Sequence, residues 1–494
     1  MAESTVVRTA SGAVAGTTVA SPCGEVDRFA GIPYGTAPVG NGRFRAATAV
    51  PAWSGVRSAA SFGPSPMQAT GGPFAAAVPG MTVTDVSEDC LTLNIWRPAG
   101  ASTMPLPVMV WVYGGAFIVG GSAAATYDGA RLAAEQQLIV ISVNYRVGAF
   151  GFLDLRTVPG GESTDTNCGL HDLALALRWV QSHIAGFGGD PTRVTLFGES
   201  AGAGSIVHLL TVPGIDGLVR GAIAQSPGID FTQTTSQSEA VTEALLAEVG
   251  ASTVAELRRV TAARLVEAQE AVAAKLLFDV GTMIFHPVVD ETFVTASPSR
   301  AIAAGAADAV ALLIGYTADE MRLFPDPRAD ELDDDALAVW VRDYLAARMA
   351  RDPGAGVAVD LVRSYPASMS GSRRWAAIQT DGIIRQPVIR LADSRGARSA
   401  TFVYQFDWPS RRTGADRGAF HAIELPFVFD AFDTFDPGGW GTFLGVDDGG
   451  LALGRALRAA WAAFAATADP SNDVLGPWPR FEPTTRSTMV LDEH

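Results

Sequence analysis

The pentapeptide Gly198-Glu199-Ser200-Ala201-Gly202 sets a serine between two glycines, where an apolar run over residues 194–197 gives way to a helical pattern over residues 203–210. A sharp turn between a strand and a helix crowds the positions two residues before and after its centre. Glycine at both positions therefore fits a turn that lifts the Ser200 hydroxyl clear of a sheet. The alternative is an ordinary glycine-rich turn that binds phosphate at a helix N-terminus, but Glu199 would place a carboxylate where the phosphate lies. The segment predicts a nucleophilic serine.

A glycine pair, Gly114-Gly115, follows an expected strand over residues 108–113. Without Cβ atoms, such residues can turn their backbone N–H groups into a cavity. Hydrolysis of an acyl group needs donors of this kind, because negative charge develops on the carbonyl oxygen under attack. We expect Gly114, Gly115 and Ala201 to form an oxyanion hole; the alternative is a plain connecting loop.

The general base can be found by elimination. The chain has six histidines, at positions 171, 183, 208, 286, 421 and 494. Hydrolases with this kind of nucleophile turn carry their triad in the chain order serine, acid, histidine. Three histidines lie before or close after Ser200 on expected helices, the fourth precedes any acid-bearing strand end, and the last is the terminal residue. His421 remains, and we expect it to take the Ser200 proton and pass it to the leaving group.

The acid should follow a central strand. Residues 310–314 have the composition of such a strand, and Asp319 and Glu320 come shortly after it. Asp407, after a second apolar run over residues 402–406, is a further candidate. Most Asp and Glu residues lie on protein surfaces, and the pattern alone does not separate Asp319 from Glu320.

These side chains need a sheet that brings strand ends together. Apolar runs of strand length, rich in Val, Ile and Leu, recur at residues 107–113, 138–143, 194–197, 221–225, 310–314 and 402–406. Their lack of alternation is typical of central strands covered on both faces. Helical patterns lie between several of them, which predicts an α/β fold with a mostly parallel, mixed sheet flanked by helices. A small region of short strands is expected before residue 100.

The stretch between about residues 230 and 400 interrupts this alternation. Helical patterns over residues 236–273 and 334–351 predict a helical cap beside the site. We expect residues 1–494 to form a single domain that contains this insert.

Several further segments carry a family resemblance: Phe29-Ala30-Gly31-Ile32-Pro33-Tyr34, Ser87-Glu88-Asp89-Cys90-Leu91-Thr92-Leu93-Asn94, Val143-Asn144-Tyr145-Arg146 and Phe187-Gly188-Gly189-Asp190-Pro191. With residues 194–202, they make the chain resemble the type B carboxylesterases, the family of bacterial para-nitrobenzyl esterases and cholinesterases, from near residue 6 to near residue 492. The resemblance implies the α/β-hydrolase fold and ester hydrolysis, and it selects Glu320 as the acid. It also implies that Glu199 orders water or charge beside the nucleophile, and that Ser226 lies close to the triad.

The chain departs from the family pattern in two places. The family usually has histidine before the glycine pair, whereas this chain has Tyr113, whose hydroxyl can still donate one hydrogen bond to hold the loop. Many relatives join the cysteine that matches Cys90 to one upstream, where this chain has Met67, so we expect Cys90 to be free. Three cysteines in a chain of this size argue against a disulfide framework and agree with a reducing compartment.

Composition narrows the possible partners. The formal net charge of −16 disfavours nucleic acid and anionic membrane surfaces. The N-terminus lacks the basic and apolar regions of a signal peptide, and the most apolar stretch is too short to span a bilayer. We therefore expect a cytoplasmic enzyme, with export by a removed leader left open. The expected partner is a small-molecule ester, with a monomer or homodimer as the form that the resemblance favours.

The favoured function is hydrolysis of carboxylic esters through an acyl-enzyme, which requires no metal and no cofactor. The same triad could instead act on carbamates or activated amides, and the residues do not distinguish these bonds. A catalytically silent binding protein is a further alternative. It is disfavoured because this chain keeps the nucleophile and every other member of the constellation.

Overall fold

The computed structural model describes residues 4–71, 83–100, 104–276, 283–349, 352–412, 417–434 and 439–493. Within these ranges one sheet has twelve strands in the order β1-β2-β3-β7-β9-β8-β10-β11-β12-β13-β14, with β4 paired to β2. Its strands are β1 (Ser4–Thr9), β2 (Gly12–Ser21), β3 (Gly24–Pro33), β4 (Val56–Ser58), β7 (Thr92–Pro98), β8 (Leu106–Val112), β9 (Ile139–Val143), β10 (Gly189–Glu199), β11 (Gly221–Gln225), β12 (Ala311–Thr317), β13 (Thr401–Phe406) and β14 (Thr488–Leu491). A separate pair joins β5 (Ser65–Pro66) to β6 (Val86–Ser87).

The central strands are parallel, as the uniform apolar runs predict. Strands β9, β8, β10, β11, β12, β13 and β14 pair in parallel, whereas β1, β2, β3, β7 and β9 pair antiparallel. Every residue of β11 and β12 is buried. Burial on both faces favours continuous Val, Ile and Leu. The carboxyl ends of the parallel strands therefore lie along one edge of the sheet. The connections to the helices begin there.

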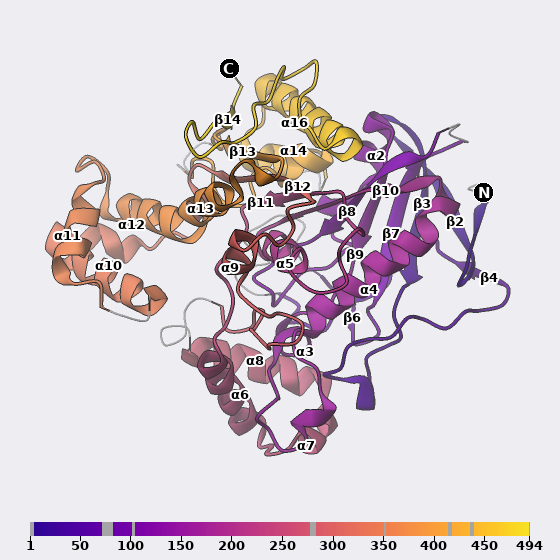
Figure 1. The fold of residues 1–494 in the computed structure, drawn as a ribbon, viewed down its shortest axis with the longest axis horizontal. Coiled ribbons are helices and arrows are strands. Elements are labelled where there is room, and N and C mark those ends of the chain that lie inside the picture. The colour runs from indigo at the N-terminus through magenta and orange to yellow at the C-terminus, as the bar shows by residue number, and fades with distance from the viewer. Residues whose placement is uncertain are drawn as a thin grey trace.

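Helices cover both faces of this sheet (Figure 1). They are α2 (Ala130–Gln136), α3 (Gly148–Phe152), α4 (Cys168–His183), α5 (Ala201–Leu209), α6 (Thr235–Val249), α7 (Val254–Arg259), α8 (Ala262–Leu276), α9 (Pro298–Ala303), α10 (Asp334–Met349), α11 (Ala355–Arg363), α12 (Gly371–Thr380), α13 (Gln386–Arg395), α14 (Leu425–Phe429), α15 (Trp440–Leu444) and α16 (Asp448–Thr467). One apolar core cluster extends from Val7 to Leu491. Residues from both ends of the chain thus share one core with the sheet.

The helices α6 to α13 lie between β11 and β13 in the chain and are interrupted by β12. The expected helical stretch 236–273 is divided into α6, α7 and α8. Gly250 ends α6 in the left-handed conformation with φ 71°, and the Thr253 side chain caps α7. The pattern therefore predicted helix correctly but missed its interruption.

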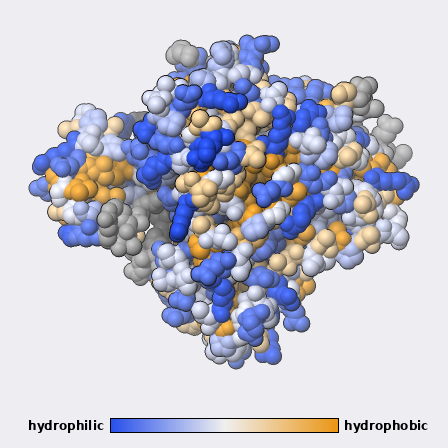
Figure 2. All heavy atoms as spheres, in the orientation of Figure 1, coloured by the Kyte–Doolittle hydropathy of each residue, from blue (hydrophilic) through white to orange (hydrophobic). Residues whose placement is uncertain are grey.

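Helices α10 and α11 project from the body as a lobe, seen at the left of Figure 1. With α12 they bury a second apolar cluster, made of Leu337, Ala338, Val341, Ala358, Val362 and Ile378. Figure 2 shows apolar atoms gathered on this lobe, where Val339 and Val357 are exposed. The lobe therefore has a small core of its own, separate from that of the sheet.

Two expectations from the sequence concern the cysteines and the apolar helices. Cys23, Cys90 and Cys168 are free, which confirms the expectation for Cys90. Within the described ranges, no helix combines the length and the apolar character needed to cross a bilayer.

Candidate active site

Ser200 stands at the junction of β10 and α5 in a strained conformation, with φ 55° and ψ −125°. Its N–H donates to the carbonyl of Gln225 on the neighbouring strand, at 2.9 Å. A Cβ at Gly202 would lie 2.1 Å from the Val112 oxygen, and one at Gly198 would lie 2.5 Å from it. Both glycines are therefore required by close backbone approach, as the sequence predicted. A positive φ at a residue other than glycine costs about 1–3 kcal/mol and is characteristic of functional sites.

Glu320 and His421 meet across the end of β12. The Nδ1 atom of His421 lies 2.6 Å from Glu320 Oε2, and the His421 N–H donates to the Glu320 carbonyl at 3.0 Å. The other carboxylate oxygen, Oε1, accepts the Thr317 N–H at 2.8 Å. The glutamate is completely buried. These bonds fix both the carboxylate and the plane of the imidazole.

The other two acid candidates have different partners. Asp319 accepts the Ala419 N–H at 3.1 Å and lies 3.4 Å from Arg322. Asp407 accepts the side-chain amide of Gln405 at 3.2 Å. Geometry thus separates Glu320 from Asp319, a distinction that the residue pattern alone left open.

The second imidazole nitrogen of His421, Nε2, faces the turn that carries Ser200. His421 Nε2 lies 3.0 Å from Glu199 Oε1, and Ser200 and His421 line the same cavity. In the described part of the chain no hydrogen bond joins the Ser200 hydroxyl to the imidazole. Catalytic hydrogen bonds are often long in the absence of substrate.

Three buried glutamates surround His421. Burial lowers the pKa of the imidazole, but the Glu199 and Glu320 carboxylates raise it more, to about 10. Burial raises the pKa of Glu199 to about 8, and burial together with the charge of Glu320 raises the pKa of Glu424 to about 7. Because the charges of these groups act on one another, their titrations are linked. A proton on Glu199 or Glu424 weakens the field that keeps His421 charged, which favours the neutral imidazole that a base requires.

The loop after β8 passes close to Ser200. A Cβ at Gly114 would lie 3.0 Å from the Ser200 Cβ and 2.7 Å from the Glu199 carbonyl. Gly115, Ala116 and Phe117 all have positive φ, at 119°, 54° and 62°. In the described residues nothing accepts a hydrogen bond from the N–H groups of Gly114, Gly115 or Ala116. Ala116 lines the cavity beside Ser200 and was missed by the sequence analysis, although it directly follows the glycine pair.

Tyr113 holds this loop through a reciprocal contact with Tyr145. The Tyr113 hydroxyl donates to the Tyr145 carbonyl at 2.9 Å, and the Tyr145 hydroxyl donates to the Tyr113 carbonyl at 2.8 Å. The two rings stack with centroids 4.6 Å apart. A Cβ at Gly120 would lie 2.5 Å from the Tyr113 ring. The Tyr113 ring thus supports the loop at Gly120. The Tyr113 carbonyl, at the start of the loop, is held by the Tyr145 hydroxyl.

Ser226 follows β11 beside the nucleophile strand. It has φ 48°, and its N–H donates to the Gly315 carbonyl at 2.9 Å. Its hydroxyl is buried and has no hydrogen-bond partner among the described residues. Because Ser226 also lines the cavity, this hydroxyl is available to a bound molecule or to water.

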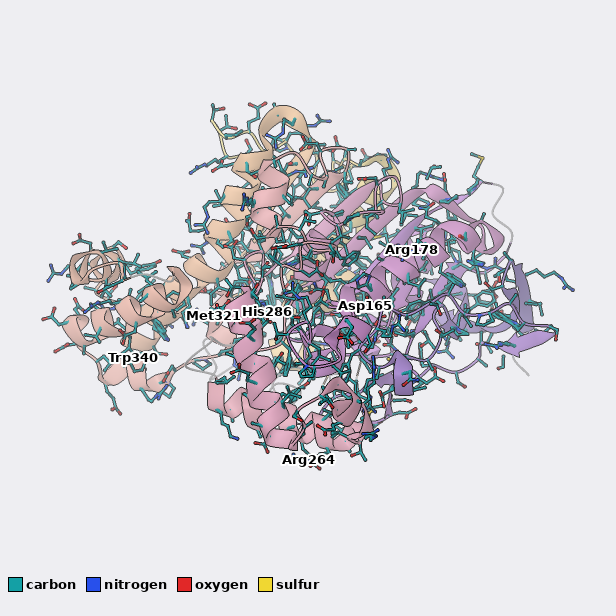
Figure 3. The ribbon with its side chains drawn as sticks, turned by 60° about the horizontal axis from the view of Figure 1, so that its bottom comes forward. Asp165, Arg178, Arg264, His286, Met321 and Trp340 are labelled. Carbon is teal, nitrogen blue, oxygen red and sulfur yellow. The ribbon has the colours of Figure 1, made fainter. Side chains whose placement is uncertain are left out.

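The cavity has a volume of about 380 Å³. Beyond the residues at its base, most of its wall is apolar: Phe231, Met283, Met321, Phe324, Trp375, Ile383 and Ile384. Asp326 and Gln379 add polar groups, and Asp326 accepts a 2.6 Å hydrogen bond from Arg328. In Figure 3, Met321 lies where the lobe that carries Trp340 joins the body. The cavity wall suits an uncharged, apolar group of a bound molecule.

Three of the remaining histidines have structural partners. His171 stacks on Phe293, His183 on Trp179, and His208 bonds to the Gly204 carbonyl and to Thr232. Burial lowers the pKa of both His208 and His286 to about 4, so both are neutral. His494 lies outside the described residues. Within the described ranges, no group of three or more His, Cys, Asp or Glu side chains is placed to hold a metal ion.

The sequence model of the carboxylesterase family matches residues 3–494. The para-nitrobenzyl esterase of Bacillus subtilis (strain 168) is 35% identical, over 99% of this chain and 94% of that protein. The phenmedipham hydrolase of Pseudarthrobacter oxydans is 34% identical, over 94% of this chain and 91% of that protein. A solved PNB esterase is similar with a TM-score of 0.85 at 34% identity, over 99% of this chain and 96% of that one. The Geobacillus stearothermophilus carboxylesterase EST55 is similar over the same shares, with a TM-score of 0.84 at 33% identity.

Proposed function

Because the chain belongs to the carboxylesterase family and is a carboxylic ester hydrolase with the α/β-hydrolase fold, we propose that Ser200 is its nucleophile, His421 its general base and Glu320 the acid that orients the base. The observation that supports this proposal is the 2.6 Å contact between His421 and Glu320, beside a cavity that Ser200 and His421 both line. Ester hydrolysis through these residues requires no metal or cofactor.

The reaction proceeds in two halves. His421 removes the Ser200 proton as the serine oxygen attacks the ester carbonyl, and the carbonyl oxygen becomes negatively charged. Backbone N–H groups of Ala201 and of the loop Gly114-Gly115-Ala116 stabilise that charge. His421 then protonates the leaving alcohol, and the acyl group stays on Ser200. Water activated by His421 attacks the acyl-enzyme, which releases the acid and restores Ser200.

Three neighbouring residues support these steps. Glu199, 3.0 Å from the free imidazole nitrogen, holds His421 between turnovers and stabilises its charged form. Tyr113 holds the oxyanion loop through its contact with Tyr145. Ser226 presents a buried hydroxyl to the cavity, where it can bind the water that attacks the acyl-enzyme.

The substrate is a small-molecule ester with an uncharged apolar group, since that chemistry matches the cavity wall. A carbamate is the second candidate, because one relative is a phenmedipham hydrolase and phenmedipham is a carbamate. The same nucleophile and oxyanion hole would attack either carbonyl. A panel of matched para-nitrophenyl esters, carbamates and anilides separates the two. We expect the ester to turn over fastest, and a faster carbamate would replace it as the substrate class.

The insert between residues 230 and 400 acts as a cap, because Trp375, Gln379, Ile383 and Ile384 form part of the cavity wall. The continuous core from Val7 to Leu491 supports a single domain over residues 1–494. Three free cysteines support a reducing, cytoplasmic location. A monomer or homodimer is the oligomeric state proposed.

Replacing the nucleophile tests the proposal. Ser200→Ala should lower turnover of para-nitrophenyl butyrate by at least about 10⁴-fold, with unchanged thermal unfolding. An organophosphonate should add to one tryptic peptide, the one that contains Ser200. Ser238→Ala is the control, because Ser238 in α6 is a serine away from the cavity whose hydroxyl donates to Asp154 at 2.9 Å. Retained turnover in Ser200→Ala, or an adduct on another peptide, would refute the assignment.

A further inference from the structure

Helices α12 and α13 form one rod with a widened turn in its middle. Residues Asp381–Arg385 are π-helical and join the two helices without a break. Trp375, Gln379, Ile383 and Ile384 of this rod line the cavity. In a regular α-helix, positions four apart drift around the axis by about 40° at each step. The wider turn reduces that drift between Gln379 and the pair Ile383 and Ile384, which line the same cavity. Such turns occur often at functional sites.

The same turn holds the segment that carries the catalytic acid. The Thr380 hydroxyl accepts the Met321 N–H at 3.1 Å, immediately after Glu320. The Arg385 guanidinium donates to the Ala318 carbonyl at 2.9 Å, two residues before Glu320. Thr380 is 1% exposed, so its hydrogen bond is shielded from water. The acid segment is therefore held on both sides of Glu320 by the wall of the cavity.

We propose that Thr380 and Arg385 are positioning residues, through which the wall of the substrate cavity holds Glu320 against His421. This inference rests on the proposed roles of Glu320 and His421 in ester hydrolysis. Neither positioning residue touches the reacting atoms. Their effect is on the orientation of the acid, which every turnover requires, and so on kcat more than on KM.

Contacts with the α10–α11 lobe hold the turn from the other side. Asp381 accepts hydrogen bonds from the Tyr365 hydroxyl at 2.5 Å and from Arg385 at 2.7 Å, so it orients the guanidinium that reaches Ala318. A Cβ at Gly382 would lie 2.6 Å from the Tyr344 hydroxyl, which explains glycine inside this rod. The lobe, the cavity wall and the acid segment therefore form a continuous series of contacts.

The test compares three variants of buried threonines with the wild-type enzyme. Thr380→Val keeps the side-chain shape and removes the hydroxyl, Thr380→Ser keeps the hydroxyl, and Thr242→Val is the matched control. Thr242 is also buried, but its hydroxyl donates to the Asp154 carbonyl at 2.6 Å, away from the cavity wall. The measurements are kcat, KM and the pH profile of kcat/KM with para-nitrophenyl butyrate.

We expect Thr380→Val to lower kcat by about 3- to 10-fold, with KM changed by less than about twofold. Thr380→Ser should restore kcat to within about twofold of wild type. The charged groups that face His421 are Glu199, Glu320 and Glu424. A looser Glu320 raises the pKa of the imidazole less, so the acid limb of the Thr380→Val profile should move to lower pH. Thr242→Val should leave both kcat and this limb unchanged.

The inference is overturned if Thr380→Val lowers the melting temperature as Thr242→Val does but keeps the wild-type kcat and pH profile. If Thr380→Val does not fold, Arg385→Gln supplies the same measurement, because Arg385 is partly exposed and its loss leaves the core intact. The phosphonate adduct on Ser200 is read independently. If the adduct forms on Ser200 but Thr380→Val and Arg385→Gln change neither kcat nor the pH profile, only the positioning role is refuted. The proposed triad is then unaffected.

Discussion

The edge of the sheet that carries the proposed catalytic residues and the α10–α11 lobe differ in the core that supports them. Ser200, Ser226 and Glu320 all follow buried parallel strands within the core that extends from Val7 to Leu491. The lobe relies on the small cluster around Leu337 and Val362. Reacting groups need positions accurate to a fraction of an ångström, which a large close-packed core provides. A separate small core tolerates more variation, so substitutions in the lobe should disturb the strand ends less.

The strongest test of the rigid region is Gly202→Ala. The added Cβ would lie 2.1 Å from the Val112 carbonyl and push α5 away from the sheet. We expect loss of more than about 100-fold in kcat/KM and a lower melting temperature, because a misplacement of about 1 Å can cost that much. Gly204→Ala is the control in the same helix, where the nearest atom would be 3.3 Å away. Comparable losses in both variants would contradict the role of close approach at residue 202.

A pair of cavity-forming substitutions compares the two cores directly. Leu313→Ala in β12 and Leu337→Ala in α10 each empty a fully buried position and should each cost about 2–5 kcal/mol. For Leu313→Ala the loss should lower the free energy of global unfolding. For Leu337→Ala it should appear as faster amide hydrogen exchange in residues 334–349, with kcat within about twofold of wild type. Equal effects on global unfolding would show that the lobe is not a separate unit.

Tyr145→Phe tests how the oxyanion loop is held. Removing this hydroxyl leaves the buried Tyr113 carbonyl without its donor, at a cost of about 1–3 kcal/mol. We expect kcat to fall about tenfold with little change in KM, since the loop acts mainly in the transition state. Tyr34→Phe removes a similar buried bond, to the Asn144 carbonyl at 2.6 Å, and should leave kcat nearly unchanged. A wild-type kcat for Tyr145→Phe would remove the tyrosine pair from the mechanism.

The smallest expected effect is a shift in pH dependence caused by Glu199→Gln. The Glu199 carboxylate raises the pKa of His421, so its loss should lower that pKa. Because the base must be neutral, activity should then persist to lower pH, by about one pH unit at the acid limb of kcat/KM. Glu256→Gln, at the surface on α7, should not move the limb. A limb that stays in place or moves to higher pH in Glu199→Gln would contradict this electrostatic role.

The sequence predicts the sheet better than it predicts the insert, for physical reasons. Buried parallel strands leave uniform apolar runs, and the backbone contacts around Ser200 require glycine at 198 and 202. The choice of Glu320 over Asp319 needed the family resemblance, because both follow the same strand. The interruption at Gly250 and the wide turn at Asp381 depend on caps and on tertiary contacts. A helical periodicity of 3.6 residues does not encode such contacts.

The separate core of the lobe has a consequence for how this enzyme can diversify. A segment that buries its own apolar residues can be exchanged between relatives when its boundary contacts are kept. Here these are Tyr344 against Gly382 and the bond from Tyr365 to Asp381. Residues 334–363 could therefore be grafted between homologous esterases with Tyr344 retained, so that the contacts leading to the Glu320 segment persist. In that sense the protrusion is the part of the molecule most open to evolutionary and engineered change.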